Sequence, residues 1–437
     1  MVERDHSGVA EGETEQLMLL QRPGLSPYTT AGTTAIQALY APSNPAFNSI
    51  YAISGNKLYQ VSNKAASAVI GTVAGDDGLV AASANFDRLA FVAYPNLYLF
   101  GATKASTSNS FRNVPVPDGY LAVDVTMLND YFVIACEDGT FFWLAPGYDD
   151  LTSNGNALHF ATAQSDPDGL VGVETLNGNL VLFGSRTVET WQPVANADLP
   201  FQRTAGQDFA RGALSRDSIR KIDNSIIWVG DDAKVYRFAN IPQKISTDGI
   251  DERLRLRTGP PSAWTFSYDG HLFYVLAIPG QGTFAFDIAS QTWSQFQTTG
   301  QVGWRPQVGC QTSTGWICGD SQTGAIWALS DASTDAGAAI SRRASATVAI
   351  AGSPKRVDNI VLDVGCEAAC TWNVRWADAD QRLIDAAWVP LQADAGSSAL
   401  SLYRMGAARG PYRTFEIEVT DPVAVRLSGA RVGEAWR

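Results

Sequence analysis

Little in the sequence marks a secreted, membrane-bound or disulfide-linked protein. It has five cysteines in 437 residues, no run of about 18 apolar residues, and no apolar segment of signal-peptide length among its first 20 residues. A small, odd number of cysteines indicates reduced thiols rather than a disulfide framework. The missing apolar runs leave no candidate for a membrane-spanning helix or a signal peptide. We therefore expect a protein that is made in the cytoplasm.

Motifs for metals and cofactors are also scarce. Cys366 and Cys370 are spaced C-x-x-x-C, but the three histidines, His6, His159 and His271, lie far from them in the sequence. A structural zinc site needs four ligands and would lack obvious partners here. We expect these cysteines to be small buried residues, and we predict neither a metal nor a cofactor.

Residues that could support catalysis are present but not grouped. The chain has no Gly-x-Ser-x-Gly nucleophile elbow and no G-x-x-x-x-G-K phosphate loop, and a glycosidase would need two facing carboxylates. The acidic candidates in loops are Asp149, Asp150, Asp166, Asp168, Asp231 and Asp232. Aspartates in such turns usually accept backbone hydrogen bonds. We therefore predict no enzymatic activity and keep a propeller hydrolase only as a third hypothesis.

The charge balance is acidic, with a net charge of −12 and a pI near 4.8. A protein that grips DNA by its phosphates needs clustered Lys and Arg, so this balance argues against tight binding of nucleic acid. An acidic protein can still surround DNA, because a negatively lined passage repels the duplex and lets it slide.

One basic segment stands out in this acidic chain. Arg253, Arg255 and Arg257 alternate with Leu254 and Leu256, which predicts a strand with the arginines on one face. Alternating arginines could contact a neighbouring subunit or a DNA backbone, and the alternative is a solvated strand face. A second basic group is equally ambiguous and consists of Arg211, Arg216, Arg220 and Lys221.

Seven similar segments recur between about residue 48 and residue 330. Each has a polar turn, an apolar strand, a turn with Gly, Asp or Asn, and a strand with an aromatic residue. The segments are residues 48–61, 86–100, 128–144, 176–192, 223–238, 268–286 and 312–329, and their aromatics are Tyr59, Tyr98, Phe142, Trp191, Tyr236, Phe286 and Trp327. These aromatics are 39 to 50 residues apart. Such a recurrence is typical of repeats that stack side by side, and it predicts an all-β, seven-bladed β-propeller with one four-stranded blade per repeat.

The strands inside these repeats have the composition of buried blades. Residues 180–183 and 226–229 are apolar at every position, which predicts strands that are covered on both faces. Turns such as residues 54–56 and 230–232 supply the Gly, Asp and Asn residues that hairpins need.

The composition of the chain changes at residue 330, because residues 330–337 are small or polar and include no aromatic residue. Further on, Phe415, Ile417 and Val419 alternate with Glu416 and Glu418, which predicts a half-buried antiparallel strand. About seven strands can be placed in the last hundred residues. We therefore expect a small C-terminal antiparallel β-sandwich.

The N-terminal segment is expected to be extended. Residues 21–28 contain two prolines and a glycine, which exclude a helix, and such an arm could close the propeller by lending a strand to the last blade. The expected domains are an N-terminal arm at residues 1–45 that leads into the first blade, the propeller at 46–330, a linker at 331–339 and a sandwich docking domain at 340–437.

Short motifs near the two ends of the chain resemble those of a known family. Their residues are Arg22, Pro23, Gly24, Leu25, Arg342, Arg343, Arg404, Gly406, Phe415, Asp421 and Pro422. With these motifs, a seven-repeat propeller and a terminal sandwich, the chain resembles the packaged-DNA stabilisation family of short-tailed bacteriophages, whose members form the tail hub, or nozzle. Members carry a glycine hairpin followed by Trp in the sandwich, whereas residues 376–380 and Trp388 stand in its place here.

The resemblance implies a structural virion protein that takes part in head completion. It implies a homo-hexameric ring in the tail, below the portal and its adaptor (the head-to-tail connector), which extends and closes the DNA channel and retains packaged DNA before ejection. The implied partners are the portal-adaptor proteins, a tail needle or tailspike or fibre proteins, and double-stranded DNA that passes without sequence-specific binding. Assembly would take place in the host cytoplasm. The alternative function is a carbohydrate-binding propeller for host-surface recognition, which would need equivalent exposed tryptophans in every blade.

Overall fold

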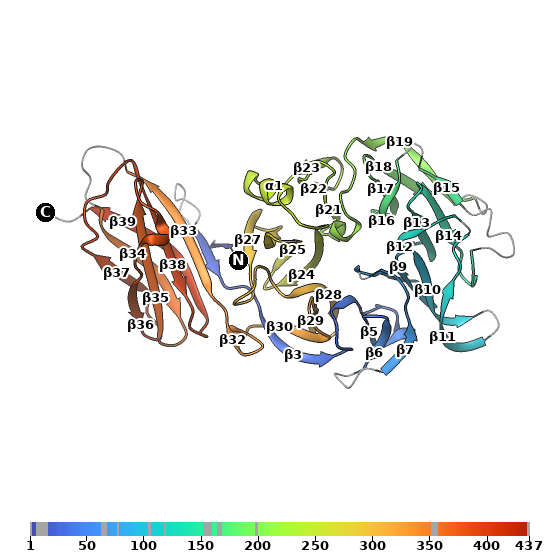
Figure 1. Ribbon diagram of the computed structural model, residues 1–437, viewed down its shortest axis with the longest axis horizontal. Coiled ribbons are helices and arrows are strands. Elements are labelled where there is room, and N and C mark those ends of the chain that lie inside the picture. Colours follow the sequence, from blue (N-terminus) through green and yellow to red (C-terminus); the bar gives the residue numbers. More distant parts are fainter. Residues whose placement is uncertain are drawn as a thin grey trace.

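In the described part of the chain, seven β-sheets form a ring and two further sheets form a sandwich beside it (Figure 1). The computed structural model describes residues 2–5, 16–62, 68–76, 78–103, 106–117, 119–151, 160–163, 168–196, 200–350 and 357–434. The expected all-β architecture, a seven-bladed propeller followed by a C-terminal antiparallel sandwich, is confirmed.

Each of the first six blades is an antiparallel meander whose strands are neighbours in the order of the chain. The first three blades consist of β4 (Ile36–Tyr40), β5 (Ile50–Ser54), β6 (Lys57–Val61) and β7 (Ala68–Thr72); β8 (Ala81–Ala84), β9 (Arg88–Ala93), β10 (Asn96–Thr103) and β11 (Ser106–Val114); and β12 (Ala122–Leu128), β13 (Tyr131–Cys136), β14 (Thr140–Leu144) and β15 (Phe160–Thr162). The next three consist of β16 (Leu170–Leu176), β17 (Asn179–Gly184), β18 (Val188–Pro193) and β19 (Phe201–Phe209); β20 (Arg220–Ile222), β21 (Ser225–Val229), β22 (Val235–Phe238) and β23 (Pro242–Lys244); and β24 (Ser262–Tyr268), β25 (His271–Ile278), β26 (Gly282–Asp287) and β27 (Thr292–Phe296).

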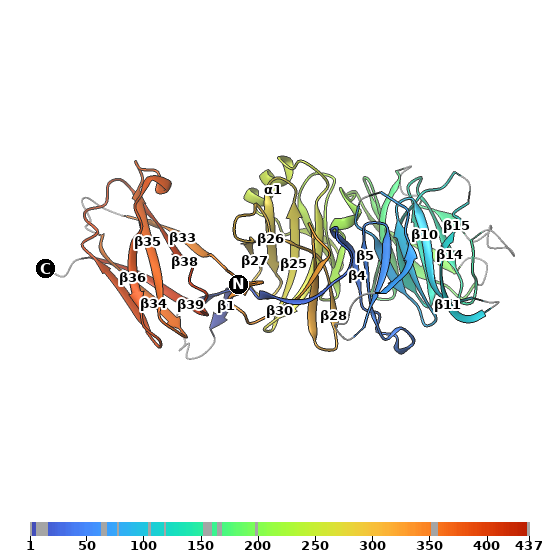
Figure 2. The ribbon, with the colours of Figure 1, turned by 60° about the horizontal axis from the view of Figure 1, so that its bottom comes forward.

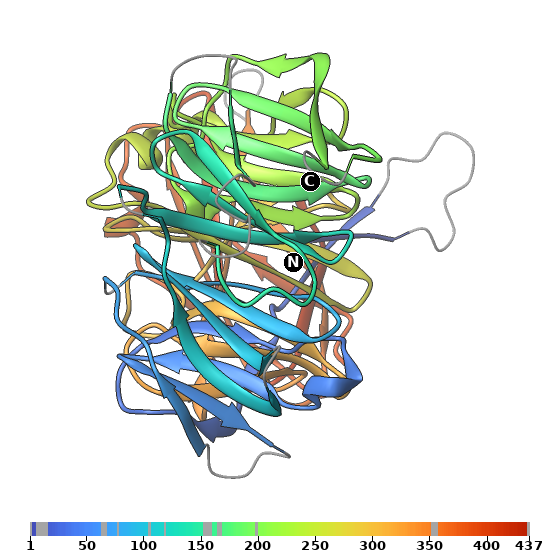
Figure 3. The same ribbon diagram turned by 90° about the vertical axis from the view of Figure 1, so that its right-hand side faces the viewer.

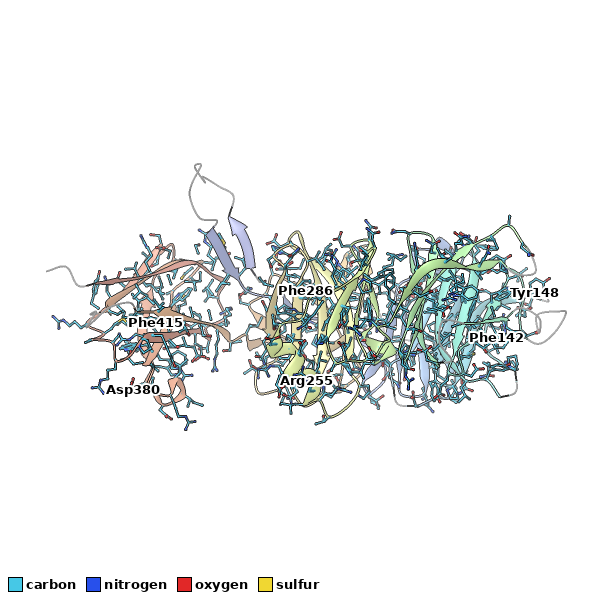
Figure 4. The ribbon with its side chains drawn as sticks, turned by 90° about the horizontal axis from the view of Figure 1, so that it is seen from above. Phe142, Tyr148, Arg255, Phe286, Asp380 and Phe415 are labelled. Carbon is cyan, nitrogen blue, oxygen red and sulfur yellow. The ribbon has the colours of Figure 1, made fainter. Side chains whose placement is uncertain are left out.

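The first strand of each blade lines the axis of the ring, where it contacts the first strand of the next blade. The seven aromatics that mark the repeats all lie in the third strand of their blades, so their equivalence is confirmed. In Figure 4, Phe142 and Phe286 mark two of these positions. The second strands are the most buried: Leu180, Leu182 and Trp228 are 0% exposed. A strand between two blades is covered on both faces, which explains why these runs lack polar residues.

Hairpin turns in successive blades use residues that tolerate positive φ. Asn177 and Gly178 have φ values of 51° and 78°, and Asp269 and Gly270 have values of 50° and 79°. Two-residue turns of this kind join the first and second strands of their blades, and they need such residues because their twist matches that of the flanking strands.

The last blade combines an N-terminal strand with strands from residues 306–339, which closes the ring (Figures 1 and 2). Its strands are β28 (Pro306–Thr312), β29 (Gly315–Asp320), β30 (Ala325–Ser330), β3 (Gly24–Thr30), β31 (Thr334–Asp335) and β32 (Ala338–Ala339). The N-terminal strand β3 pairs antiparallel with β30 and is the fourth strand of this blade. The suggested loan of a strand from the arm is therefore what the structure shows.

The first 45 residues do not form one arm but contribute to three sheets. Strand β2 pairs with the sandwich, β3 completes the last blade, and β4 is the innermost strand of the first blade. The segment expected as a linker likewise holds β31 and β32, which extend the last blade. The pairings of β2 with β39, and of β3 with β30 and β31, join residues about 300 to 400 positions apart, which sequence periodicity does not reveal. The domain boundaries drawn from the sequence remain predictions.

The sandwich lies beside the sixth and seventh blades (Figure 1), and it is largely hidden behind the propeller in the view of Figure 3. Its strands are β1 (Val2–Asp5), β2 (Gln16–Leu20), β39 (Val425–Glu434), β34 (Val357–Cys366) and β37 (Ala399–Tyr403) in one sheet, and β33 (Arg342–Ala349), β38 (Tyr412–Val419), β35 (Cys370–Asp378) and β36 (Val389–Ala393) in the other. Between the sheets lies an apolar core that includes Trp372, Val374 and Phe415. Hairpin β1–β2 extends away from the body of the molecule (Figure 4).

Helical structure in the described residues is brief. It consists of α1 (Asp248–Arg255) and the 3-10 turns η1 (Pro45–Phe47), η3 (Arg216–Ser218) and η4 (Leu383–Asp385). None of the described helices has the length and apolar composition needed to span a membrane.

Candidate assembly surfaces

The expected arginine strand is a helix. Arg253 and Arg255 lie in the last turn of α1, and Arg257 follows it. Leu254 is fully buried whereas Leu256 is 56% exposed, so the two leucines do not share a face. The prediction that the three arginines line one face of a strand is therefore wrong.

Local sequence signals explain why this segment is helical. Thr247 occupies the N-cap position with extended backbone angles, and Asp248 and Asp251 fall in the first turn, where negative charge suits the helix dipole. The buried residues Ile250 and Leu254 are four apart, which places both on one helical face. The alternation of Arg and Leu covers only five residues, and these helical signals outweigh it.

Two of the three arginines are held by the protein itself. The guanidinium of Arg253 lies 5.0 Å from the ring centre of Phe284 and donates from Nη1 to the carbonyl oxygen of Gln281 at 3.5 Å. Nη1 of Arg257 donates to the carbonyl oxygen of Leu254 at 2.7 Å and so caps the end of the helix. These contacts give both side chains structural roles.

Arg255 is the most exposed of the three. Its side chain is 56% exposed and lies 3.2 Å from the carboxylate of Glu252, which is 60% exposed (Figure 4). An exposed ion pair of this kind contributes little to stability, on the order of 0–1 kcal/mol, so Arg255 is available to a partner. It also borders a pocket of about 420 Å³ whose lining residues are Leu214, Arg255, Arg257, Gly259 and Pro260.

Arg216, from the second basic group, crosses the axis of the propeller. It lies in η3, before the fifth blade, and donates to the carbonyl oxygens of Val123 in the third blade, at 3.1 Å, and of Leu79 before the second blade. Asp217 pairs with it at 2.5 Å, and the Arg216 side chain is 15% exposed. The central shaft of the propeller is therefore narrow enough, at the level of Arg216, for one side chain to span it.

The other members of this basic group make separate contacts. Arg211 lies 5.9 Å from the ring centre of Tyr236, and Arg220 donates to the carbonyl oxygen of Ile219 at 2.6 Å. The group is thus adjacent in sequence without forming one basic surface.

Next to Arg216 lies a carboxyl group in an unusual environment. Asp124 is almost fully buried, and its two oxygens accept hydrogen bonds from the backbone N–H groups of Val125, at 2.9 Å, and Val173, at 3.0 Å. Burial raises the pKa of Asp124 to about 6, and Arg216 and these hydrogen bonds oppose the rise. No pattern in the sequence indicates this site, because its members come from separate blades.

The arginine of the N-terminal motif forms a buried ion pair. Arg22 donates to both carboxylate oxygens of Asp335, at 2.9 and 2.5 Å, and each side chain is 6% exposed. It also donates to the carbonyl oxygens of Pro23 and Gln297, and it stacks 5.1 Å from the ring centre of Trp304. Arg22 therefore connects the N-terminal segment to the sixth and seventh blades.

Gly24 and Leu25, two further buried residues of the N-terminal motif, also pack where β3 completes the last blade. A Cβ atom on Gly24 would lie 2.1 Å from the carbonyl oxygen of Ala332, so only glycine allows this approach. Leu25 is 2% exposed and belongs to the apolar cluster around Trp264 and Trp327. Both residues have an architectural role.

The C-terminal motif residues also serve the fold. Arg342 donates to the carbonyl oxygen of Asp421 at 2.8 Å, and the Asp421 carboxylate accepts from the backbone N–H of Thr371 at 2.6 Å. Arg343 pairs with Glu418 at 2.7 Å on the exposed face of the sheet.

The remaining motif residues are spread over the sandwich. Phe415 is 3% exposed in its core, whereas Arg404 and Pro422 are exposed. Gly406 has a φ of 80°, and its carbonyl oxygen accepts from Arg413 at 3.5 Å. The motif residues therefore do not converge on one ligand site.

Two of the acidic loop residues that were considered for catalysis, Asp168 and Asp232, have local hydrogen-bond partners. Asp168 accepts hydrogen bonds from the backbone N–H groups of Arg186, at 2.7 Å, and Thr187, at 3.0 Å. Asp232 accepts from Lys234 and Tyr236. Asp166 and His159 lie outside the described residues. Among the residues that the structure describes, no group of three His, Cys, Asp or Glu side chains could hold a metal ion.

The cysteines and tryptophans of the blades are mostly buried. Burial raises the pKa of the Cys136 and Cys310 thiols to about 12, so neither thiol is activated. Trp143 and Trp228 are 0% exposed and Trp191 is 6% exposed, so these indoles offer no surface on which a sugar could stack.

Comparison with known proteins identifies the family. Residues 9–334, most of the chain, match the family described as "Bacteriophage P22 Gp10, beta-propeller". The chain belongs to this family. Over 152 residues it is 27% identical to "Tail hub protein gp10" of Salmonella phage P22, an alignment that covers 33% of this chain and 30% of that protein. The resemblance drawn from the end motifs is thus confirmed at the level of the family.

Two solved structures match the chain at low sequence identity. The WD40 β-propeller domain of Doa1 matches with a TM-score of 0.45 and 10% identity, over 71% of this chain and 98% of that one. The extracellular domain of the putative one-component system BT4673 from B. thetaiotaomicron matches with a TM-score of 0.44 and 9% identity, over 85% of this chain and 48% of that one.

Proposed function

We propose that this chain is a structural protein of a short-tailed phage, located in the virion tail after assembly in the host cytoplasm. In this proposal six copies form a ring below the portal and its adaptor, extend and close the DNA channel, and retain packaged DNA. The observation that carries the proposal is the match of the propeller to the P22 Gp10 family. The expected partners are the portal-adaptor proteins, a needle, tailspike or fibre protein, and the duplex itself.

The geometry of the propeller supports a channel between copies rather than within one copy. Arg216 spans the axis between the second, third and fifth blades. A DNA duplex is wider than a shaft that one side chain can cross. Any duplex must therefore run along outer surfaces, which several copies arranged in a ring could enclose.

The charge of the chain supports passage of DNA without tight binding. The net charge is −12, and the structure gives Arg22, Arg216 and Arg253 internal partners. Acidic residues outnumber basic ones, 44 to 32, so the overall charge repels the phosphates and would let the duplex slide. Closure of the channel would then come from steric narrowing or a bound plug.

DNA retention tests the proposal most directly. Phage particles produced while this gene is silenced should lack the tail tip and lose their DNA to give empty heads. Nuclease-protected DNA per particle, measured against particles from the unsilenced host, gives the readout. Full and stable particles that only fail to adsorb would overturn the proposal and move the protein to the host-recognition class.

The exposed Arg255 is the proposed subunit contact on α1. Arg255→Ser should weaken ring assembly, whereas Arg382→Ser, at a 79% exposed arginine in the sandwich, should leave assembly unchanged. Native mass spectrometry and DNA retention give the readouts. If Arg255→Ser and a triple variant that adds Arg253→Ser and Arg257→Ser both assemble normally, α1 is not part of the contact.

A further inference from the structure

Two segments of the chain cross from the propeller to the sandwich, and they run side by side. Residues 21–23 join β2 to β3, and residues 331–341 join β30 to β33. Leu25 pairs with Asp335 in parallel register, and the N–H of Ala336 donates to the carbonyl oxygen of Leu25 at 2.7 Å. The junction is therefore a double strap rather than a single linker.

Apolar contact between the two domains is small. The sandwich core forms its own cluster of buried side chains. Within the described residues, Leu20 is the residue of the sandwich sheets that packs against an apolar cluster of the propeller, and it is half-buried. Domains joined by a small interface move relative to one another unless other contacts prevent it. The orientation of the sandwich thus depends on polar contacts.

Gln21 connects the strap to the sandwich. Its Oε1 atom accepts hydrogen bonds from Oγ of Ser333, on the propeller side, and from Nε of Arg342, the first residue of β33, both at 3.1 Å. Nη1 of Arg342 continues the chain of contacts to the carbonyl oxygen of Asp421. One amide oxygen therefore bonds both domains.

Arg342 depends on this contact more than a surface arginine would. Burial lowers its pKa, and no carboxylate lies within ion-pair distance of it in the described parts of the chain. Its Nη2 atom is buried and lacks a hydrogen-bond partner among those residues. Removal of the Gln21 oxygen would leave a partly buried cation with one fewer acceptor.

We propose that Gln21 and Arg342 form a clasp that holds the sandwich at one orientation to the propeller. Without the clasp both domains remain folded, and the sandwich swings about the double strap. In a ring of identical copies, a fixed orientation would present every sandwich alike. The clasp itself rests on contacts within one chain and does not depend on the proposed tail function.

Single-molecule energy transfer tests the clasp on the full chain. Dyes are attached at Ser313→Cys in the propeller and Ser401→Cys in the sandwich, both exposed positions, and a chain without added cysteines gives the labelling background. Arg342→Ala and Gln21→Ala should each widen the distribution of transfer efficiency at least twofold. Arg343→Ala, one residue away with a 56% exposed side chain, is the matched control and should not.

Two further results keep the test decisive. Gln21→Ala leaves every sandwich residue in place, and near-ultraviolet circular dichroism reports whether each variant remains folded. Gln21→Glu gives Arg342 a carboxylate and should narrow the distribution to the wild-type width or below. If folded Gln21→Ala and Arg342→Ala chains keep the wild-type distribution, the clasp does not set the orientation.

Discussion

At the scale of single residues, the buried ion pair of Arg22 and Asp335 explains why the N-terminal motif contains an arginine. Each side chain is 6% exposed, so removal of one partner leaves an uncompensated charge. Arg22→Ala should lower the free energy of unfolding by about 3–5 kcal/mol. Arg255→Ala is the control, because Arg255 and Glu252 are 56% and 60% exposed and such a pair contributes about 0–1 kcal/mol. Denaturant titration followed by tryptophan fluorescence measures both, and equal losses would contradict the assignment.

Asp124 should make stability depend on pH. Burial raises its pKa to about 6 from 3.8 in the unfolded chain, so between these values the folded state binds more protons. Stability from this group is therefore present below about pH 4 and is lost as pH rises through 6, by about 2–3 kcal/mol. The Asp124→Asn variant has no titrating group at this position. The unfolding free energy of the wild type, minus that of the variant, should therefore fall by this amount between pH 3.5 and pH 7. A difference that stays constant with pH would refute the prediction.

At the scale of elements, helix α1 places Leu254 and Leu256 in different environments, whereas in a strand both side chains would lie on the same face. Leu254 is 0% exposed in the cluster that includes Tyr274 and Phe286, whereas Leu256 is 56% exposed. Leu254→Ala should cost about 2–5 kcal/mol, and Leu256→Ala should change stability by less than about 0.5 kcal/mol. Thermal unfolding of the two variants gives the comparison. Equal effects would favour the strand that the alternation had suggested.

The elements also show what the sequence could and could not predict. Strands such as residues 180–183 were predictable because burial on both faces leaves no polar position, and the aromatics of the third strands recur with the blade. The pairing of β3 with β30 and of β2 with β39 was not predictable from periodicity, since register across about 300 to 400 residues is set by tertiary contacts. The position of Arg216 across the propeller axis was not predictable for the same reason, because its partners Val123 and Leu79 are distant in the sequence. The end motifs identified the family but not their own structural roles.

At the scale of the whole molecule, stability is divided between two separate cores. The sandwich encloses its own apolar cluster, while the blades share clusters with their neighbours around the ring. The ring is closed by β3 in the last blade, so no blade has a free position along the circle. Loss of one blade should therefore disrupt the whole propeller, whereas the sandwich can unfold independently apart from the clasp and the shared segment around β2.

This division predicts two thermal transitions in differential scanning calorimetry. Val374→Ala in the sandwich and Val229→Ala in the fifth blade are matched changes, because both valines are 0% exposed. The first should lower only the sandwich transition, by about 4–8 °C for each kcal/mol lost, and the second only the propeller transition, by a smaller shift because a larger unit has a larger unfolding entropy. Each remaining transition acts as the internal control. A single transition that both substitutions lower together would mean that the double strap couples the two cores into one cooperative unit.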